Sequence, residues 1–351
     1  MNRVRAWIEK APNGASAIAT MTFDDGLRET ARILNELCKK YDIRASLMLC
    51  SGIRIDTTLD MWRALFAEGY LHPESHSHLH KYLTRSHPEN LTEEIISDEI
   101  EGSLKRLNEL LPGYDILTFG IPYSSYAEPA REHLYKSFYM VRSGSCVLAD
   151  ESARGKMQLA DPPLDRGVPG SLYSPYVVRM MPEKSSVYPM ITPDAILDYL
   201  DRCVRDGGWF ISVAHGIAEG ENLDIKVCDL EKIMKRMKEH KDRGDLWVTS
   251  LTDATKYIRE RKSSTLEAVS EREGEIILSL NMSDTTEDGL PLPAEVFNYP
   301  LTVAVALEKE GDYVTYTLDG KSLSAPVIRK EDGVFAYIEM RPNTKTKVLI
   351  N

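Results

Sequence analysis

The hydrophobic pattern of residues 15–261 alternates between two kinds of segment. Short apolar runs bounded by turn residues are typical of buried strands, and they occur at Ala15–Met21, Ala45–Cys50, Phe138–Gly144, Trp209–Gly216 and Trp247–Ser250. Segments with apolar residues at helical spacing lie between them, at Glu29–Tyr41, Asp60–Gly69, Glu89–Leu111, Thr192–Arg205, Asp229–His240 and Leu251–Arg261. Regular alternation of strands and helices predicts an α/β fold with a parallel sheet.

A different pattern begins after Lys262, where the sequence Ser263-Ser264-Thr265 suggests a linker. Short alternating runs follow, at Glu275–Met282, Leu301–Glu308, Tyr313–Leu318, Val334–Glu339 and Thr346–Ile350. Several short strands separated by turns predict a small all-β sandwich. We therefore expect two domains, an enzyme-like domain over residues 1–262 and an accessory domain over residues 263–351.

One segment of the first domain, Asp150–Tyr188, is dense in proline and glycine and shows no periodicity. Long irregular segments inside a domain often carry function. We expect a loop that lines a substrate site, with a run of short strands as the alternative.

Composition narrows the classes of function. The chain has 351 residues, of which 42% are hydrophobic and 28% charged, as in globular proteins with a substantial core. Its net charge of −11 argues against a nucleic-acid-binding surface, which needs clustered cations. No apolar run long enough for a membrane span or a signal peptide follows Met1–Lys10. Five cysteines without close pairing fit reduced thiols, so we expect a cytoplasmic protein, or a secreted one if a leader has been removed.

The candidate chemistry lies in two short motifs. Asp24 and Asp25 follow the first buried strand and precede Gly26, and two carboxylates at such a position need positive charge nearby. His76 and His80 are four residues apart, so one helical turn would place both imidazoles on the same face. Two histidines and one carboxylate, with a position open to water, make a catalytic metal site. Taken singly, the motifs also fit a plain turn and a solvated helix face.

Together these motifs resemble the first two motifs of the NodB-homology polysaccharide deacetylases, carbohydrate esterase family four. The resemblance implies a distorted (β/α) barrel, a metal bound by Asp25, His76 and His80, and Asp24 as catalytic base. We expect the two aspartates to diverge, because neighbouring strand residues point to opposite faces. This ligand set suits Zn²⁺, with Co²⁺ or Ni²⁺ as possible replacements.

Leu117–Ser124 resembles the third motif of the family. This resemblance implies that the backbone N–H of Tyr123 helps to hold an oxyanion. Gly120 stands where many family members carry an arginine. Arg142, at the end of the next predicted strand, is our candidate for the missing cation beside Asp24. The alternative for Arg142 is a surface arginine paired with an unrelated acid, and for Leu117–Ser124 a plain turn after a strand.

The fifth motif resembles Trp209–Gly216, which implies that His215 protonates the leaving group. A structural histidine at a strand end is the alternative. The Asp and Trp of the fourth motif have no counterpart near Phe138–Gly144.

The resemblance implies a metal-dependent hydrolase that removes acetyl groups from an N-acetylated sugar or oligosaccharide. The alternatives are an O-acetyl esterase, a hydrolase of other C–N bonds such as cyclic amides, and a non-catalytic sugar-binding protein. We expect no nucleic-acid or membrane partner. For residues 263–351 we favour packing or a homo-oligomer contact over glycan binding.

Overall fold

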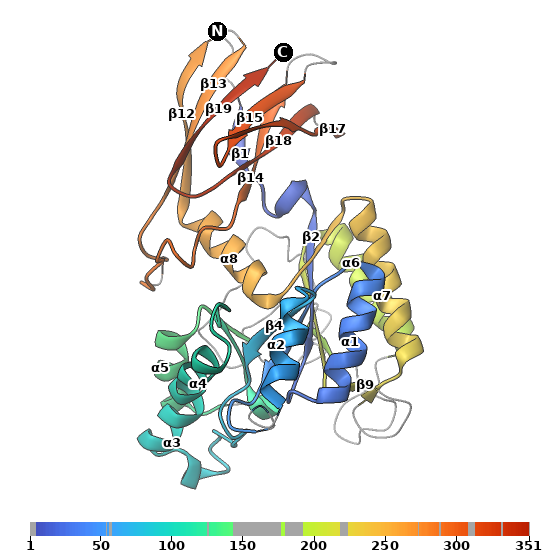
Figure 1. Cartoon of the computed structure of the whole chain (residues 1–351), viewed down its shortest axis with the longest axis vertical. Coiled ribbons are helices and arrows are strands. Elements are labelled where there is room, and N and C mark those ends of the chain that lie inside the picture. The colour runs from blue at the N-terminus through green and yellow to red at the C-terminus, as the bar shows by residue number, and fades with distance from the viewer. Residues whose placement is uncertain are drawn as a thin grey trace. The chain divides into compact units, whose positions relative to one another are not determined.

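The computed structural model describes residues 5–350, apart from residues 54, 56–57, 125, 143–176, 180–191, 218–223, 273, 288, 308–312 and 331–332. The chain divides into two compact units (Figure 1). One comprises residues 16–255, and the other comprises residues 1–15 together with residues 256–351.

The unit of residues 16–255 is built on a parallel sheet with the strand order β6-β5-β4-β3-β2-β8-β7, and β11 pairs with the first half of β2. The strands are β2 (Ala17–Phe23), β3 (Ala45–Leu49), β4 (Leu71–Ser75), β5 (Thr118–Gly120), β6 (Met140–Arg142), β7 (Val177–Arg179), β8 (Trp209–Ala214) and β11 (Leu246–Val248). Every residue of β2, β3, β4 and β8 is buried, as expected for a parallel sheet covered on both faces. The carboxyl ends of these strands meet at one edge, where such folds carry their functional residues.

Helices cover the sheet in two groups (Figure 1). One group contains α1 (Arg28–Tyr41), α6 (Pro193–Asp206) and α7 (Val227–Asp242), and the other contains α3 (Glu93–Ser97), α4 (Ser103–Leu110) and α5 (Glu128–Ser137). The remaining α-helices of the described residues are α2 (Leu59–Ala67) and α8 (Leu251–Lys262). The predicted distorted (β/α) barrel fold is confirmed.

The predicted helix 89–111 differs from the observed one in two ways. It begins at Glu93, after Thr92, whose hydroxyl accepts a hydrogen bond from the N–H of Ile95. A π-helical turn, η4 (Asp98–Gly102), then separates α3 from α4. Single π turns inside α-helices occur frequently at functional sites.

The second unit contains two antiparallel sheets, which confirms the predicted all-β character of the C-terminal residues. The first sheet has the order β1-β14-β18-β17, with β1 (Ala6–Ile8), β14 (Leu301–Leu307), β18 (Gly333–Met340) and β17 (Val327–Lys330). The second has the order β12-β13-β19-β15-β16, with β12 (Ser264–Arg272), β13 (Glu275–Met282), β19 (Thr344–Ile350), β15 (Val314–Leu318) and β16 (Lys321–Ala325).

This division differs from the predicted domains in two places. The N-terminal residues belong to the C-terminal unit, because β1 pairs with β14. The sequence did not predict this pairing, because a strand of three residues is too short to show a hydrophobic pattern. The predicted linker 263–265 is wrong: Ser264 and Thr265 begin β12 and pair with Met282 and Asn281 of β13.

Three further expectations concern the segment Asp150–Tyr188, membrane-spanning helices and the cysteines. Most of Asp150–Tyr188 lies outside the described residues, and Val177–Arg179 within it is a strand. Among the helices that the structure describes, none combines the length and apolar character that a membrane crossing requires. The four cysteines in the described ranges carry free thiols, and Cys146 lies outside them.

Candidate active site

The two aspartates lie where β2 ends. Asp24 is buried, and its N–H donates a hydrogen bond to the carbonyl of Ala214 at the end of β8, over 2.8 Å. Asp25 and Gly26 then adopt the left-handed conformation, with φ of 70° and 61°. The expectation that the two carboxylates point to opposite faces is wrong, because the strand ends at Phe23 and the chain turns at Asp25. Oxygens of both aspartates lie within 4 Å of Nε2 of His76, at 3.9 Å for Asp24 and 3.5 Å for Asp25.

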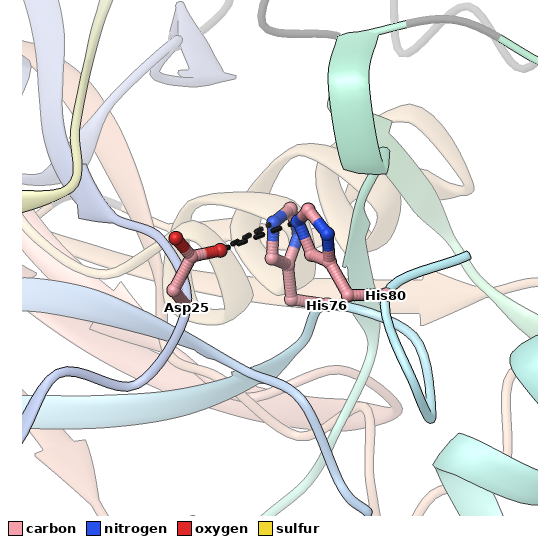
Figure 2. A group of neighbouring side chains, drawn as sticks. All are labelled: Asp25, His76 and His80. Carbon is pink, nitrogen blue, oxygen red and sulfur yellow. Dashed lines mark ion pairs between the residues drawn. The ribbon is translucent and has the colours of Figure 1, made fainter. Parts of the chain in front are cut away.

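The two histidines come from the end of β4 and the loop after it. The predicted helical turn is wrong: Ser77 and His80 adopt the left-handed conformation, with φ of 69° and 59°. The imidazoles nevertheless meet Asp25, whose Oδ1 lies 3.5 Å from Nε2 of His76 and 3.3 Å from Nε2 of His80 (Figure 2). The three candidate ligand atoms all lie within 4.8 Å of one another.

The geometry of this trio fits a bound cation. Nδ1 of His76 donates a hydrogen bond to the carbonyl of Gly120 over 2.8 Å, so a neutral ring presents the lone pair of Nε2 to the carboxylate. Oδ1 of Asp25 is buried and has no hydrogen-bond partner in the described residues. With this tautomer, Nε2 of His76 and Oδ1 of Asp25 are two acceptors 3.5 Å apart, and they repel each other unless a metal ion or a proton lies between them. Burial raises the pKa of Asp25, but the two imidazoles outweigh burial and hold it well below its usual range.

Asp24 is paired with a buried arginine. Nη2 of Arg142 donates to Oδ1 of Asp24 over 2.5 Å, and the Arg142 side chain is only 1% exposed. Burial raises the pKa of Asp24, but the charges of Arg142, His76 and His215 outweigh burial and lower it. The structure thus places Arg142 beside Asp24, away from the surface.

Gly120 explains how the guanidinium fits. Gly120 of β5 and Arg142 of β6 are register partners. A Cβ atom on Gly120 would lie 2.6 Å from Nη2 of Arg142 and 2.7 Å from Cε of Met48. Because Gly120 has no side chain, the guanidinium of Arg142 from the neighbouring strand can lie there.

His215 follows β8, next to the strand that carries Asp24. Its charge contributes to lowering the pKa of both Asp24 and Asp25, which places it at the same site. Nδ1 of His215 is buried and has no hydrogen-bond partner among the described residues. Within the described ranges, no carboxylate forms a hydrogen bond to this nitrogen.

Tyr123 follows β5 in a short 3₁₀ turn and has a φ of 54°. Its ring centroid lies 4.6 Å from that of His80 and 3.3 Å from that of Tyr82, on which it stacks. Burial raises the pKa of Tyr123 to about 12. The side chain therefore stays neutral beside the trio, and it packs against one of the candidate ligands.

Two other histidines near the second motif, His72 and His78, have different partners. Nδ1 of His72 lies 3.1 Å from the buried carboxylate of Glu74, and Nδ1 of His78 lies 2.8 Å from Oγ of Ser51. Neither belongs to the trio. Sequence reasoning missed Glu99, a buried carboxylate that binds the backbone of the His80 loop. An acid within a helix gives no signal of such a role.

The sequence matches one protein family. Residues 11–139 match the polysaccharide deacetylase family, a span that includes Asp24, Asp25, His76, His80 and Tyr123. No curated protein matches the sequence.

Solved structures show distant similarity. A CE4 family pseudoenzyme from Bacillus anthracis is 12% identical with a TM-score of 0.44, over 70% of this chain and 66% of that chain. A peptidoglycan deacetylase from Bacillus subtilis is 18% identical with a TM-score of 0.40, over 68% and 89%. A family 4 carbohydrate esterase from Streptomyces lividans, in complex with acetate, is 15% identical with a TM-score of 0.41, over 68% and 92%. These similarities are too distant to carry an activity over to this chain.

Proposed function

We propose that this chain, whose residues 11–139 belong to the polysaccharide deacetylase family, is a metal-dependent hydrolase that removes acetyl groups from N-acetylated sugars. The observation that carries the proposal is the trio of Asp25, His76 and His80 beside the ion pair of Asp24 and Arg142. A cation site and an ionised carboxylate within 4 Å of one imidazole are the two elements that hydrolysis by an activated water requires.

The trio would hold a divalent metal through one carboxylate oxygen and two Nε2 atoms. The donor set suits Zn²⁺, and Co²⁺ or Ni²⁺ could replace it. Bound there, the metal would supply a lowered pKa for water and polarisation of the acetyl carbonyl. The hydrogen bond from Nδ1 of His76 to Gly120 fixes the tautomer that leaves Nε2 free to bind.

Asp24 is the general base in this proposal. It accepts the proton of the attacking water, which requires an ionised carboxylate at working pH. Arg142 supports this role, because its guanidinium lowers the pKa of a carboxyl that burial alone would raise. The ion pair also fixes the orientation of one carboxylate oxygen and leaves Oδ2 on the side of His76.

His215 is the proposed general acid. It would donate a proton to the departing sugar amine, and its place at the end of β8 puts it beside Asp24. The backbone N–H of Tyr123 is the proposed donor to the oxyanion that forms on the acetyl group.

One observation favours a second candidate, an O-acetyl esterase. Nδ1 of His215 has no hydrogen-bond partner in the described residues, so no hydrogen bond to this nitrogen fixes the orientation of the ring there. An ester needs less help than an amide from a general acid, because an alkoxide is a far better leaving group than an amide anion. The same residues would then act on acetylated hydroxyl groups.

The deciding experiment measures acetate release from oligosaccharides of N-acetylglucosamine and from acetylated xylan, with Zn²⁺ and after chelation. The N-deacetylase proposal expects release from the first substrate that chelation abolishes and Zn²⁺ restores. Release from acetylated xylan alone would favour the esterase. No release from either substrate, with sugar binding retained, would favour a non-catalytic sugar-binding protein, and Asp24→Asn provides the inactive control.

A further inference from the structure

We propose that Glu99 is a positioning residue for the metal site, because its carboxylate holds the loop that presents His80. Glu99 lies in the π turn η4, is fully buried and is not a candidate ligand. This role rests on the proposed metal site, which Glu99 would hold in shape without binding the metal itself.

Glu99 binds three backbone groups of the loop. Its carboxylate accepts the N–H of Leu79 over 3.0 and 3.1 Å and the N–H of Lys81 over 3.3 Å. Its backbone carbonyl accepts the N–H of His78 over 3.1 Å. The residues on either side of His80 are thus tied to one side chain, which comes from an element about twenty residues further along the chain.

The N–H of His80 itself donates to the hydroxyl of Ser77 over 3.0 Å. All four consecutive N–H groups of residues 78–81 are therefore satisfied, three by Glu99 and one within the loop. In a helical turn these groups would donate to carbonyls of the preceding turn. Glu99 substitutes for that pattern, which explains how His76 and His80 can converge without a helix.

The loop needs this support because its backbone is strained. Ser77 and His80 both have positive φ, a conformation that is unfavourable for residues with a side chain. Such residues persist only where the surrounding contacts determine the conformation. The contacts to Glu99 flank His80, so losing them would let the loop relax and would move the imidazole away from Asp25.

The carboxylate of Glu99 suits this arrangement. The hydrogen-bond partners of its oxygens are backbone N–H groups, and no cation pairs with it among the described residues. Hydrogen bonds to an ionised acceptor are stronger than neutral ones, and a carboxylate can accept several at once. A glutamine would keep the size, and its oxygen could still accept both N–H groups at the Oε2 position, but its NH₂ group would then replace Oε1 and face the N–H of Leu79 at 3.1 Å, where two donors repel each other.

Glu101 provides a matched control. It lies two residues further along the same π turn, and its carboxylate accepts from Nδ1 of His133 and pairs with Lys136, away from the loop. Substituting Glu101 perturbs the same helix without touching residues 78–81. Any effect on the metal site that is specific to Glu99 therefore does not come from general damage to the helix.

The test titrates metal-free protein with Co²⁺, following its d–d absorption, for the wild type, Glu99→Gln, Glu99→Asp and Glu101→Gln. Residues that orient ligands typically contribute about 10–100-fold to metal affinity. We expect Glu99→Gln to weaken Co²⁺ binding by at least about tenfold, Glu99→Asp to weaken it less, and Glu101→Gln to match the wild type. Affinity of Glu99→Gln within twofold of the wild type would overturn the proposal.

Hydrogen–deuterium exchange on the metal-free proteins separates this inference from the proposed function. Faster exchange of the 78–81 amides in Glu99→Gln than in Glu101→Gln is the expected result, and equal exchange would contradict the positioning role. A wild type that binds no Co²⁺ would refute the metal site, while the exchange measurement would still decide whether Glu99 holds the loop. If Glu99→Gln does not fold, Glu99→Asp carries both measurements, because it keeps the charge and shortens the reach.

Discussion

Gly120 and Arg142 are register partners on neighbouring strands, and the space that Gly120 leaves open holds the guanidinium of Arg142. That guanidinium donates to Oδ1 of Asp24, 118 positions away in the sequence. A glycine on one strand and an arginine on the next thus act as a pair that serves the proposed catalytic base.

The first prediction concerns the arginine. Arg142→Ala should lower turnover at least about tenfold, because it removes the main charge that keeps Asp24 ionised, while bound metal stays unchanged. Without the guanidinium the pKa of Asp24 rises. A base works only when ionised, so the acidic limb of the pH–rate profile should move to higher pH. Arg142→Lys, which keeps the charge, should shift the limb less. Wild-type turnover with an unmoved acidic limb would exclude the role.

The second prediction concerns the glycine. Gly120→Ala should displace Arg142 from Asp24, because the new Cβ would lie 2.6 Å from Nη2. Turnover should fall, and the acidic limb should move in the same direction as in Arg142→Ala. Residues in contact give non-additive effects, so the double variant should lose little more than the worse single variant. Effects on turnover that simply multiply would show that the two positions act independently.

The third prediction concerns the metal. His80→Ala should lose most bound zinc and all activity and keep the fold, since His80 supplies one of the three candidate ligand atoms. His78→Ala is the control, because the His78 ring contacts Ser51 and lies outside the trio. Elemental analysis of purified protein decides the matter. Stoichiometric zinc in His80→Ala, or zinc lost equally from both variants, would refute the ligand assignment.

The fourth prediction separates base from acid. Asp24→Asn should retain metal and lose roughly 10²–10⁴-fold in rate, the usual scale for a general base. His215→Ala should slow amide hydrolysis more than hydrolysis of an activated acetate ester, whose leaving group needs little protonation. Kinetics on both substrate types measure the difference. Equal losses on amide and ester would assign His215 another function.

The sequence predicts the positions of the candidate residues well where they follow the ends of buried strands. Asp24, Asp25 and His76 directly follow buried strands, and an apolar run that stops at a charged residue is visible without any structure. Arg142 could be proposed in the same way, because it ends β6. Which acid it pairs with depends on the sheet order and on the space at Gly120, and neither can be read from spacing.

Other features could not be predicted, for definite physical reasons. A spacing of four between His76 and His80 fits a helical turn and a left-handed loop equally well, and the buried carboxylate of Glu99 decides between them. Glu99 looks like one more acid on a solvated helix face. The strand β1 is too short to show a pattern, so its pairing with β14 was missed.

The last prediction concerns the C-terminal unit, where Glu260 of α8 is buried. Its Oε1 accepts the N–H of Tyr299 over 3.0 Å, while Oε2 has no hydrogen-bond partner in the described residues. Burial raises the pKa of Glu260 to about 8, and the Tyr299 hydrogen bond offsets only part of that effect.

The folded protein therefore keeps this proton up to a pH of about 8, whereas the unfolded chain releases it near the ordinary glutamate pKa of 4.5. Because the folded state binds more protons across this window, the free energy of unfolding should fall as pH rises through it, by up to about 1.4 kcal/mol per pH unit from this group. Glu260→Gln should remove that component and be more stable than the wild type at pH 8. Urea unfolding at pH 5 and pH 8 tests this, with Glu295→Gln, at an exposed position, as the control. A variant whose pH dependence matches the wild type would show that Glu260 is already ionised in the folded protein.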